Sequence, residues 1–429
     1  MMDERVAGID DWNDPRLPAL ARLANRLDPV AAARLLPLDE DALLRAARRR
    51  TGLSDFGGDD FREPLRLVLG DLAADPCLTP LGRVVARSVL GQVLTTRLCI
   101  AHEVASMRGR PLAPVHAPIV IVGLPRTGTT HMHNLLSRAP ALRFLPLWES
   151  VAPFRPPGLR GRLPDMRRAH TALRLRVLDR LMPLLRVMHE MEPDLPHEEL
   201  QLCAPSLRSF FFESGFRLPT YQPWYAGRQH PEAYAYLAQA LALLQRDAPE
   251  RRWVLKSPQH LDQLDALVAM FPDAVIVRTH RDPARAALSL ITMILYARRA
   301  CYRHNDVTAE ARAWVDRLEQ MLRDSLAQGE HLPAGRVIDV EFDAFVADPT
   351  GTAARVLAFA GVEVDGPTGA ALEAYQRANP RDRHGRIEYD FEALGLDTGE
   401  VGERLAFYRD RVGLAPGAGR EARAARCVD

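Results

Sequence analysis

The sequence contains almost no lysine. Of its 56 lysine and arginine residues, one is a lysine, Lys256, and all the others are arginines. The two side chains are not interchangeable, because lysine carries a compact ammonium and arginine a broad planar guanidinium. Lys256 is therefore a candidate functional residue.

Strong net charge and paired cysteines are also missing. The formal net charge of +1 over 429 residues gives no overall field that would attract a nucleic acid, so any anion site has to be local. The five cysteines are odd in number and include no Cys-x-x-Cys pair. This pattern argues against a disulfide framework or a zinc site.

Long apolar runs are absent as well. The first twenty residues carry acidic side chains throughout and no apolar core typical of a signal peptide. No later segment approaches 18 uncharged apolar residues, so we expect no membrane span. These features predict a cytoplasmic protein, and they leave its oligomeric state open.

The pattern that is present predicts an α/β fold. Residues 1–112 read as a helical region, with helical periodicity at 39–53 and 79–107. After a proline-rich joint, short β-branched runs alternate with helical segments over residues 113–412. Such alternation predicts a three-layer, mostly parallel sheet related to P-loop folds, and residues 413–429 are expected to form a flexible tail.

An insert rich in proline, arginine and aromatic residues interrupts this alternation at 141–252. We expect it to cap the sheet edge and form the wall of an acceptor pocket. Its most aromatic part contains Phe210, Phe211 and Phe212. Two interpretations of these side chains stay open: they line the pocket, or they are ordinary core.

The stretch IVGLPRTGTT, residues 121–130, predicts an anion-binding loop. Gly123 and Gly128 have the spacing of a Walker loop, but Thr129 stands where the Walker lysine would be. A glycine-bounded turn from a buried strand into a helix still collects backbone N–H groups and the helix dipole at one point. Without the lysine, the loop suits a 5′-phosphate with one further group better than a triphosphate.

A second anion site is predicted where the next strands end. Arg281 follows a buried strand, and Ser289 lies about two turns into the helix that Pro283 opens. Lys256 ends another strand, so parallel topology brings it to the same sheet edge. Together these residues predict a ligand with two separated phosphate groups.

Four motifs then resemble a known family. They are GLPRTGTTH, LKSPQH, VRTHRDPARAALS and HGRIEYDFEALGL, at residues 123–131, 255–260, 277–289 and 384–396. In order and spacing they are similar to the bacterial sulfotransferases that use 3′-phosphoadenosine-5′-phosphosulfate (PAPS). The likeness runs over roughly residues 45–412 and implies a P-loop-like fold without a bound metal.

The resemblance implies roles for individual residues. The 5′-phosphosulfate loop would consist of Arg126, Thr127, Gly128, Thr129 and Thr130. The 3′-phosphate would be held by Arg281 and Ser289, and Arg386 in the C-terminal motif is a further candidate for it. Lys256 would stabilise the departing bridging oxygen. His131 stands where relatives carry the tryptophan that stacks on adenine, so the adenine partner is left open.

The general base is the least determined role. An acceptor hydroxyl must lose its proton as it attacks sulfur, so a carboxylate or imidazole has to lie within hydrogen-bond reach. Relatives place a histidine two residues after the lysine, where this chain has Pro258. Glu149 is the first candidate and His197 the second. The further candidates are Glu198, Glu199 and His260.

The expected activity is in-line transfer of a sulfuryl group from PAPS to an acceptor hydroxyl or amine, with adenosine 3′,5′-bisphosphate (PAP) as the other product. The aromatic insert favours a small apolar or amphipathic alcohol. Two alternatives are a small-molecule kinase on the same fold and a nucleotide-binding protein without turnover.

Overall fold

The computed structural model describes residues 6–161, 163–379, 386–389, 391–414 and 427–428. Its centre is a parallel sheet of five strands in the order β3, β4, β2, β5, β6. The bounds of these strands are Ile119–Val122 for β2, Leu142–Arg143 for β3, Arg252–Lys256 for β4, Val275–His280 for β5 and Val337–Glu341 for β6. The predicted α/β fold with a mostly parallel sheet is confirmed.

The apolar side chains of strand β2 require the sheet to be covered on both faces. All four of its residues are buried, and alternate side chains belong to different cores. Val120 and Val122 pack on one face, and Ile119 and Ile121 pack on the other. A β-branched run without polar positions is stable only where both faces of a sheet are covered.

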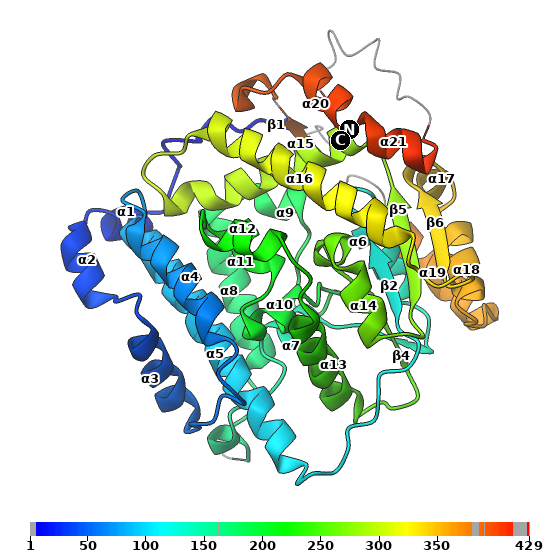
Figure 1. Ribbon diagram of the computed structural model, residues 1–429, viewed down its shortest axis with the longest axis horizontal. Helices are drawn as coiled ribbons and strands as arrows, with labels where there is room; N and C mark the ends of the chain where they lie inside the picture. Colours follow the sequence, from blue (N-terminus) through cyan, green and yellow to red (C-terminus); the bar gives the residue numbers. More distant parts are fainter. Residues whose placement is uncertain (1–5, 162, 380–385, 390, 415–426, 429) are drawn as a thin grey trace.

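Helices cover the two faces (Figure 1). The face of Ile119 and Ile121 packs against α6 (Thr129–Leu136), α17 (Phe342–Ala347), α18 (Pro349–Phe359) and α19 (Gly366–Ala378). The other face belongs to a larger core that includes α13 (Pro231–Gln245), α14 (Leu264–Met270), α15 (Pro283–Arg298) and α16 (Val307–Gly329).

The N-terminal helices are α1 (Ala19–Ala24), α2 (Pro29–Leu35), α3 (Glu40–Thr51), α4 (Arg62–Ala74) and α5 (Pro80–Ser106). Helices α3, α4 and α5 share this larger core, and α1 and α2 lie against α5. Helix α5 starts where the sequence predicts, because Thr79 accepts a hydrogen bond from the Gly82 N–H at 2.9 Å and Pro80 takes the first helical position. By length and composition α5 could cross a membrane, but 56% of its most apolar window is buried inside the protein.

The insert folds into short helices beside the sheet edge. They are α7 (Leu147–Val151), α8 (Arg167–Leu181), α9 (Leu185–Met188), α10 (Leu200–Cys203), α11 (Phe210–Gly215) and α12 (Tyr221–Ala226). Helices α20 (Thr398–Arg404) and α21 (Ala406–Val412) follow in the C-terminal part. A second, three-stranded sheet joins β1 (Val6–Ala7), β7 (Arg386–Tyr389) and β8 (Cys427–Val428), so segments from both ends of the chain lie side by side.

Candidate active site

The three predicted anchor points meet at the carboxyl edge of adjacent strands. The glycine loop follows β2, Lys256 ends β4, and Arg281 follows β5, with β2 between the other two. The register pairs Ile121 with Lys256. All three anchors line one cavity of about 630 Å³. Ligands of open α/β sheets bind at this edge.

The loop between β2 and α6 has a fixed, unusual backbone. A Cβ on Gly123 would lie 2.2 Å from Thr279 Oγ1, so only glycine lets the loop approach β5 this closely. Arg126 and Gly128 both have positive φ angles, 74° and 83°. For an arginine this conformation is strained, and such strain concentrates at functional sites.

Two contacts hold Arg126 and the loop in place. Arg126 Nη1 donates to the Met188 carbonyl oxygen at 2.8 Å, which ties the loop to α9 of the insert. Arg281 Nη1 donates to the Arg126 carbonyl oxygen at 2.9 Å, so the two predicted anion sites are in direct contact. The Arg281 guanidinium also lies 4.2 Å from the centre of the Phe342 ring.

The threonines of the loop divide into two kinds. Thr129 and Thr130, at the start of α6, line the cavity. The Thr127 side chain is buried, donates to the Leu124 carbonyl oxygen at 2.7 Å and lies 2.6 Å from Thr279 Oγ1. Thr127 therefore holds the loop against β5, and its hydroxyl is committed to the protein.

Lys256 forms the centre of the charged part of the cavity. Its ammonium donates to Glu198 Oε1 at 2.5 Å and to Thr130 Oγ1 at 3.4 Å, and the residue is 4% exposed. Burial raises the pKa of the Glu198 carboxyl, but the charge and hydrogen bond of Lys256, together with the nearby His189 and His197, outweigh burial and hold that pKa at about 2. Glu198 is a carboxylate at neutral pH in this arrangement.

Glu199 and His260 lie directly behind Lys256. Glu199 Oε2 accepts a hydrogen bond from the Lys256 backbone N–H at 2.9 Å, and its other oxygen is paired with His260 Nε2. The Tyr234 hydroxyl contacts His260 Nδ1 at 2.8 Å. Glu199 and His260 are fully buried and do not line the cavity, so they fix the end of β4 without reaching a ligand.

The other base candidates lie in different surroundings. His197 lines the cavity and its Nε2 contacts Gln201 Nε2 at 3.1 Å. Burial lowers the pKa of His197 to about 3. Glu149 is not a cavity residue: its carboxylate faces Arg143 Nη2 at 3.3 Å, on the short strand β3. The structure therefore brings Glu198 and His197, but not Glu149, to Lys256's cavity.

One predicted phosphate ligand, Ser289, is not among the residues that line the cavity. Ser289 is buried on α15, and within the described chain its hydroxyl has no hydrogen-bond partner. Arg386 begins β7, and its side chain lies outside the described part of the protein. Among the described residues, no group of His, Cys, Asp and Glu lies together in a way that could hold a metal ion.

The cavity continues into an apolar part. Helices α9, α11 and α15 contribute its side chains, together with β7: Leu185, Met188, Phe210, Phe211, Leu290, Met293, Ile294 and Ile387. Phe210 and Phe211 thus line the cavity, whereas Phe212 is completely buried and does not. The pocket interpretation therefore applies to Phe210 and Phe211, and the core interpretation applies to Phe212.

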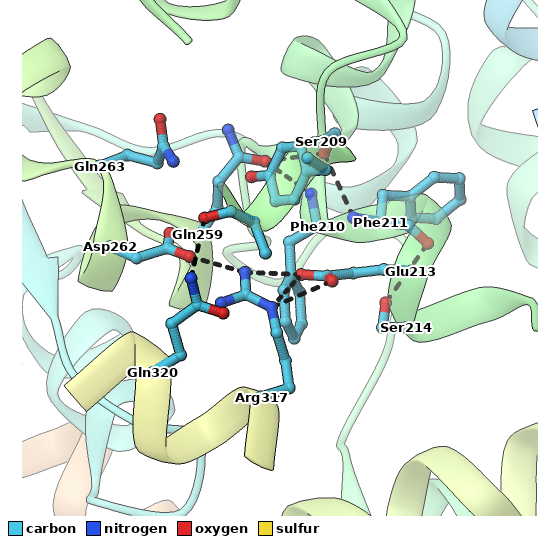
Figure 2. A network of polar contacts seen from close by, with 12 residues as sticks. Ser209, Phe210, Phe211, Glu213, Ser214, Gln259, Asp262, Gln263, Arg317 and Gln320 are labelled. Carbon is cyan, nitrogen blue, oxygen red and sulfur yellow. Dashed lines mark hydrogen bonds and ion pairs between the residues drawn. The ribbon is translucent and has the colours of Figure 1, made fainter. Parts of the chain in front are cut away.

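A buried polar network fixes this aromatic wall to the segment after Lys256 (Figure 2). Gln259 Oε1 accepts hydrogen bonds from Ser209 Oγ at 2.8 Å and from the Phe210 N–H at 3.2 Å. Arg317 of α16 bonds to Glu213 at 2.9 Å and to Asp262 at 2.6 Å. Because all three ionic groups are buried, removing Arg317 would leave two buried carboxyl groups without their cation.

Two aromatic residues near the loop, Phe345 and Tyr375, could not be predicted from local sequence patterns. His131, which follows the two threonines, lies 5.5 Å from Phe345 and 5.9 Å from Tyr375 by ring centres, and all three line the cavity. His131 Nε2 also contacts Gln376 Oε1 at 2.8 Å. Phe345 and Tyr375 come from α17 and α19, more than 200 residues further along the chain, and no local pattern marks them.

Comparisons with known proteins identify the family. Residues 118–366 match the model of the sulfotransferase family. The crystal structure of the sulfotransferase STF9 from Mycobacterium avium is similar with a TM-score of 0.75 and 27% identity, over 87% of this chain and 96% of that chain. A search of curated sequences finds no match.

A second solved structure agrees with the first. The sulfotransferase STF1 from Mycobacterium tuberculosis H37Rv is similar with a TM-score of 0.69 and 28% identity, over 86% of this chain and 98% of that chain. Both neighbours are bacterial sulfotransferases, and the similarity covers nearly the whole of each neighbour's chain. Since the family model covers more than half of the 429 residues, the chain belongs to the sulfotransferase family.

Proposed function

We propose that the protein transfers a sulfuryl group from PAPS to the hydroxyl of a small apolar or amphipathic acceptor. The observation that carries the proposal is the convergence of the glycine loop, Lys256 and Arg281 on one cavity that continues into an apolar part. The charged part suits a doubly phosphorylated donor, and the apolar part suits the carbon skeleton of an acceptor. An amine acceptor is the chemical variant that the same site would serve.

The donor would bind along the sheet edge. Its 5′-phosphosulfate would accept hydrogen bonds from the backbone at the start of α6 and from Thr129, Thr130 and Arg126. Arg126 Nε supports this, because it is a buried donor without a hydrogen-bond partner among the described residues. Arg281 would contact the 3′-phosphate, and the adenine would lie against His131 and Phe345.

Transfer would exchange the partners of Lys256. In the structure its ammonium is paired with Glu198. With the donor bound, the ammonium would turn toward the oxygen that bridges phosphorus and sulfur and stabilise the charge that appears there. Glu198 then loses the neighbour that keeps its pKa low, and burial raises its basicity.

Glu198 is therefore the proposed general base. It would accept the acceptor's proton while the acceptor oxygen forms a bond to sulfur. The bond between sulfur and the bridging oxygen breaks at the same time, and PAP leaves with both electrons of that bond. No covalent enzyme intermediate is needed, so positioning and charge stabilisation supply the catalysis.

Thermal denaturation with PAP and with ATP tests the donor assignment. A ligand that binds the native state at about 100 times its Kd stabilises it by about 2.7 kcal/mol, so PAP should raise the Tm by several degrees. ATP should raise it much less. Arg281→Ala should reduce the shift caused by PAP. A Tm that rises only with ATP and Mg²⁺ would instead support a kinase.

Release of PAP from PAPS, measured with a set of long-chain alcohols and sterols, tests the chemistry. Lys256→Ala should lower turnover by roughly 10²- to 10³-fold, the effect of removing one preorganised electrostatic donor. Because this change leaves Glu198 unpaired, Lys256→Ala combined with Glu198→Gln is the control for effects on donor binding. Near-normal turnover in both variants would remove Lys256 from the mechanism.

A further inference from the structure

Exposed apolar side chains are concentrated on one part of the surface. Fourteen large apolar side chains are exposed among the described residues. Eleven of them lie in residues 20–35, at Val84 and in residues 159–177. The most exposed are Leu20, Leu35, Leu23 and Val30, at 81%, 69%, 61% and 59%, and Leu173 of the second segment is 58% exposed. Single exposed apolar residues are normal, but a cluster of this size marks an interaction site.

These segments are neighbours in space. At the end of α8, Leu181 packs with Leu17 and Ala21 beside α1, and with Leu81 at the start of α5. Further along, Arg174 of α8 donates to Gln92 of α5 at 3.1 Å. Helices α1 and α8 therefore both border the first half of α5, where Val84 is exposed. We call this surface of α1, α2, the first half of α5 and residues 159–181 the basic apolar face.

Helix α8 has little reason to be stable on its own. Of its 15 residues only Thr171 is buried. Helices in proteins are stabilised mainly by packing an apolar face, and α8 instead presents Leu173 and Val177 to solvent. The apolar side chains of α8 are therefore available to a further surface.

The charge of the face is strongly positive. Helix α8 contains five arginines and one aspartate, within a chain whose net charge is +1. Arg167 and Arg168 are paired with Asp165 and Asp194. Arg176 and Arg180 are exposed and form no ion pair with any described side chain. Segments that lie on a lipid surface combine basic residues with exposed apolar side chains, and the surface around α8 has both.

We propose that the basic apolar face binds a membrane surface containing anionic lipids. Arginines would contact the lipid head groups, while Leu20, Leu23, Leu173 and Val177 would enter the boundary of the acyl region. A second copy of the chain fits less well, because a symmetric dimer would set the positive α8 against itself. The proposal does not depend on the proposed function and concerns attachment to one leaflet.

Sedimentation with vesicles tests the proposal. The intact protein should bind vesicles of equal parts phosphatidylglycerol and phosphatidylcholine, bind phosphatidylcholine alone much less, and release as salt screens the charges. Arg176→Gln with Arg180→Gln should weaken binding roughly thirtyfold, the effect of losing two basic residues near a charged surface. Leu173→Ser with Val177→Ser should also weaken it.

Matched controls carry the same changes elsewhere. Phe359→Ser with Val364→Ser removes two exposed apolar side chains from outside the face, and Arg312→Gln with Arg355→Gln removes two exposed arginines there. Both should bind like the unmodified protein, and circular dichroism checks that every variant is folded.

Three outcomes would overturn the proposal. In the first, the protein binds equally to both vesicle types. In the second, the face variants and the control variants lose the same amount of vesicle binding. In the third, the protein does not bind vesicles and is a dimer, which Leu173→Ser with Val177→Ser splits into monomers. Light scattering after size-exclusion chromatography identifies the last case, in which the face would be an interface between copies.

Discussion

At the scale of single residues, the site separates two neighbouring glutamates by environment. Glu198 faces the cavity and the Lys256 ammonium, whereas Glu199 is fully buried and accepts the Lys256 backbone N–H. Glu199 has helical backbone angles as the N-cap of α10, whereas Glu198 precedes the helix, so one side chain can meet a ligand while the next holds the strand. His260 belongs to the second role, since its partners are Glu199 and Tyr234.

This division gives a prediction about the base. Glu198→Gln should lower turnover by about 10²- to 10⁴-fold, the usual effect of removing a general base, with little loss of PAP affinity. Glu149→Gln should leave turnover within a small factor, because Glu149 faces Arg143 outside the cavity. Steady-state kinetics and PAP calorimetry check both. A large loss of turnover in the Glu149 variant with a small one in the Glu198 variant would reverse the assignment.

The sequence could predict the residues that local chemistry marks. Lys256 is the single lysine, and the spacing of Gly123 and Gly128 identifies the loop. It could not show that Glu149 faces Arg143 and Glu198 faces Lys256, because these neighbours are set by the fold and not by local spacing. Nor could it place the Ser289 side chain, since a two-turn spacing gives a height along α15 but not the distance to the cavity.

At the scale of elements, the loop depends on how closely β2 and β5 approach. Gly123→Ala should destabilise the protein by about 1–3 kcal/mol, the cost of overpacking, because the new Cβ would collide with Thr279. Gly402→Ala on α20 has open space around the new Cβ and should be neutral or stabilising by at most about 1 kcal/mol. Urea denaturation of the two variants measures the difference. Equal stabilities would mean that the loop relaxes freely.

Some strands could be predicted from the sequence and others could not. The expected strands around Ile119, Trp253 and Val275 appear as β2, β4 and β5, because buried parallel strands need continuous apolar runs. Strand β3 and the second sheet were not predicted. Strands β1, β3 and β8 have two residues each. Strand β7 has four residues and pairs with β1 and β8, which come from opposite ends of the chain. Pairing of this kind leaves no periodic signal.

At the scale of the whole molecule, buried histidines link stability to pH. Burial lowers the pKa of His133 to about 3, of His189 to about 4 and of His197 to about 3. In the unfolded chain a histidine has a pKa of about 6.5. Below that pH the unfolded state binds protons that the folded state does not, so stability falls as pH decreases from about 6.5 toward 4.

The expected loss between pH 7 and pH 5.5 is about 1 kcal/mol for each of these histidines. Burial raises the pKa of Glu149 and Glu213, so these two groups stabilise the folded state as the pH falls, opposite to the histidines. The contribution of one histidine is therefore measured by comparing the unmodified protein with a variant. His197→Gln should lose about 1 kcal/mol less than the unmodified protein over this range. Urea denaturation at the two pH values measures both. Identical losses would show that His197 is charged in the folded state.

The near-absence of lysine has a practical consequence for chemical labelling. Apart from the α-amino group, the chain has one primary amine, and it lies in the cavity at 4% exposure. An amine-selective acylating reagent that modifies a side chain must therefore have entered the cavity, and its adduct can be assigned by mass without engineering the protein. Protection from such a reagent becomes a direct readout of what occupies the space around Lys256.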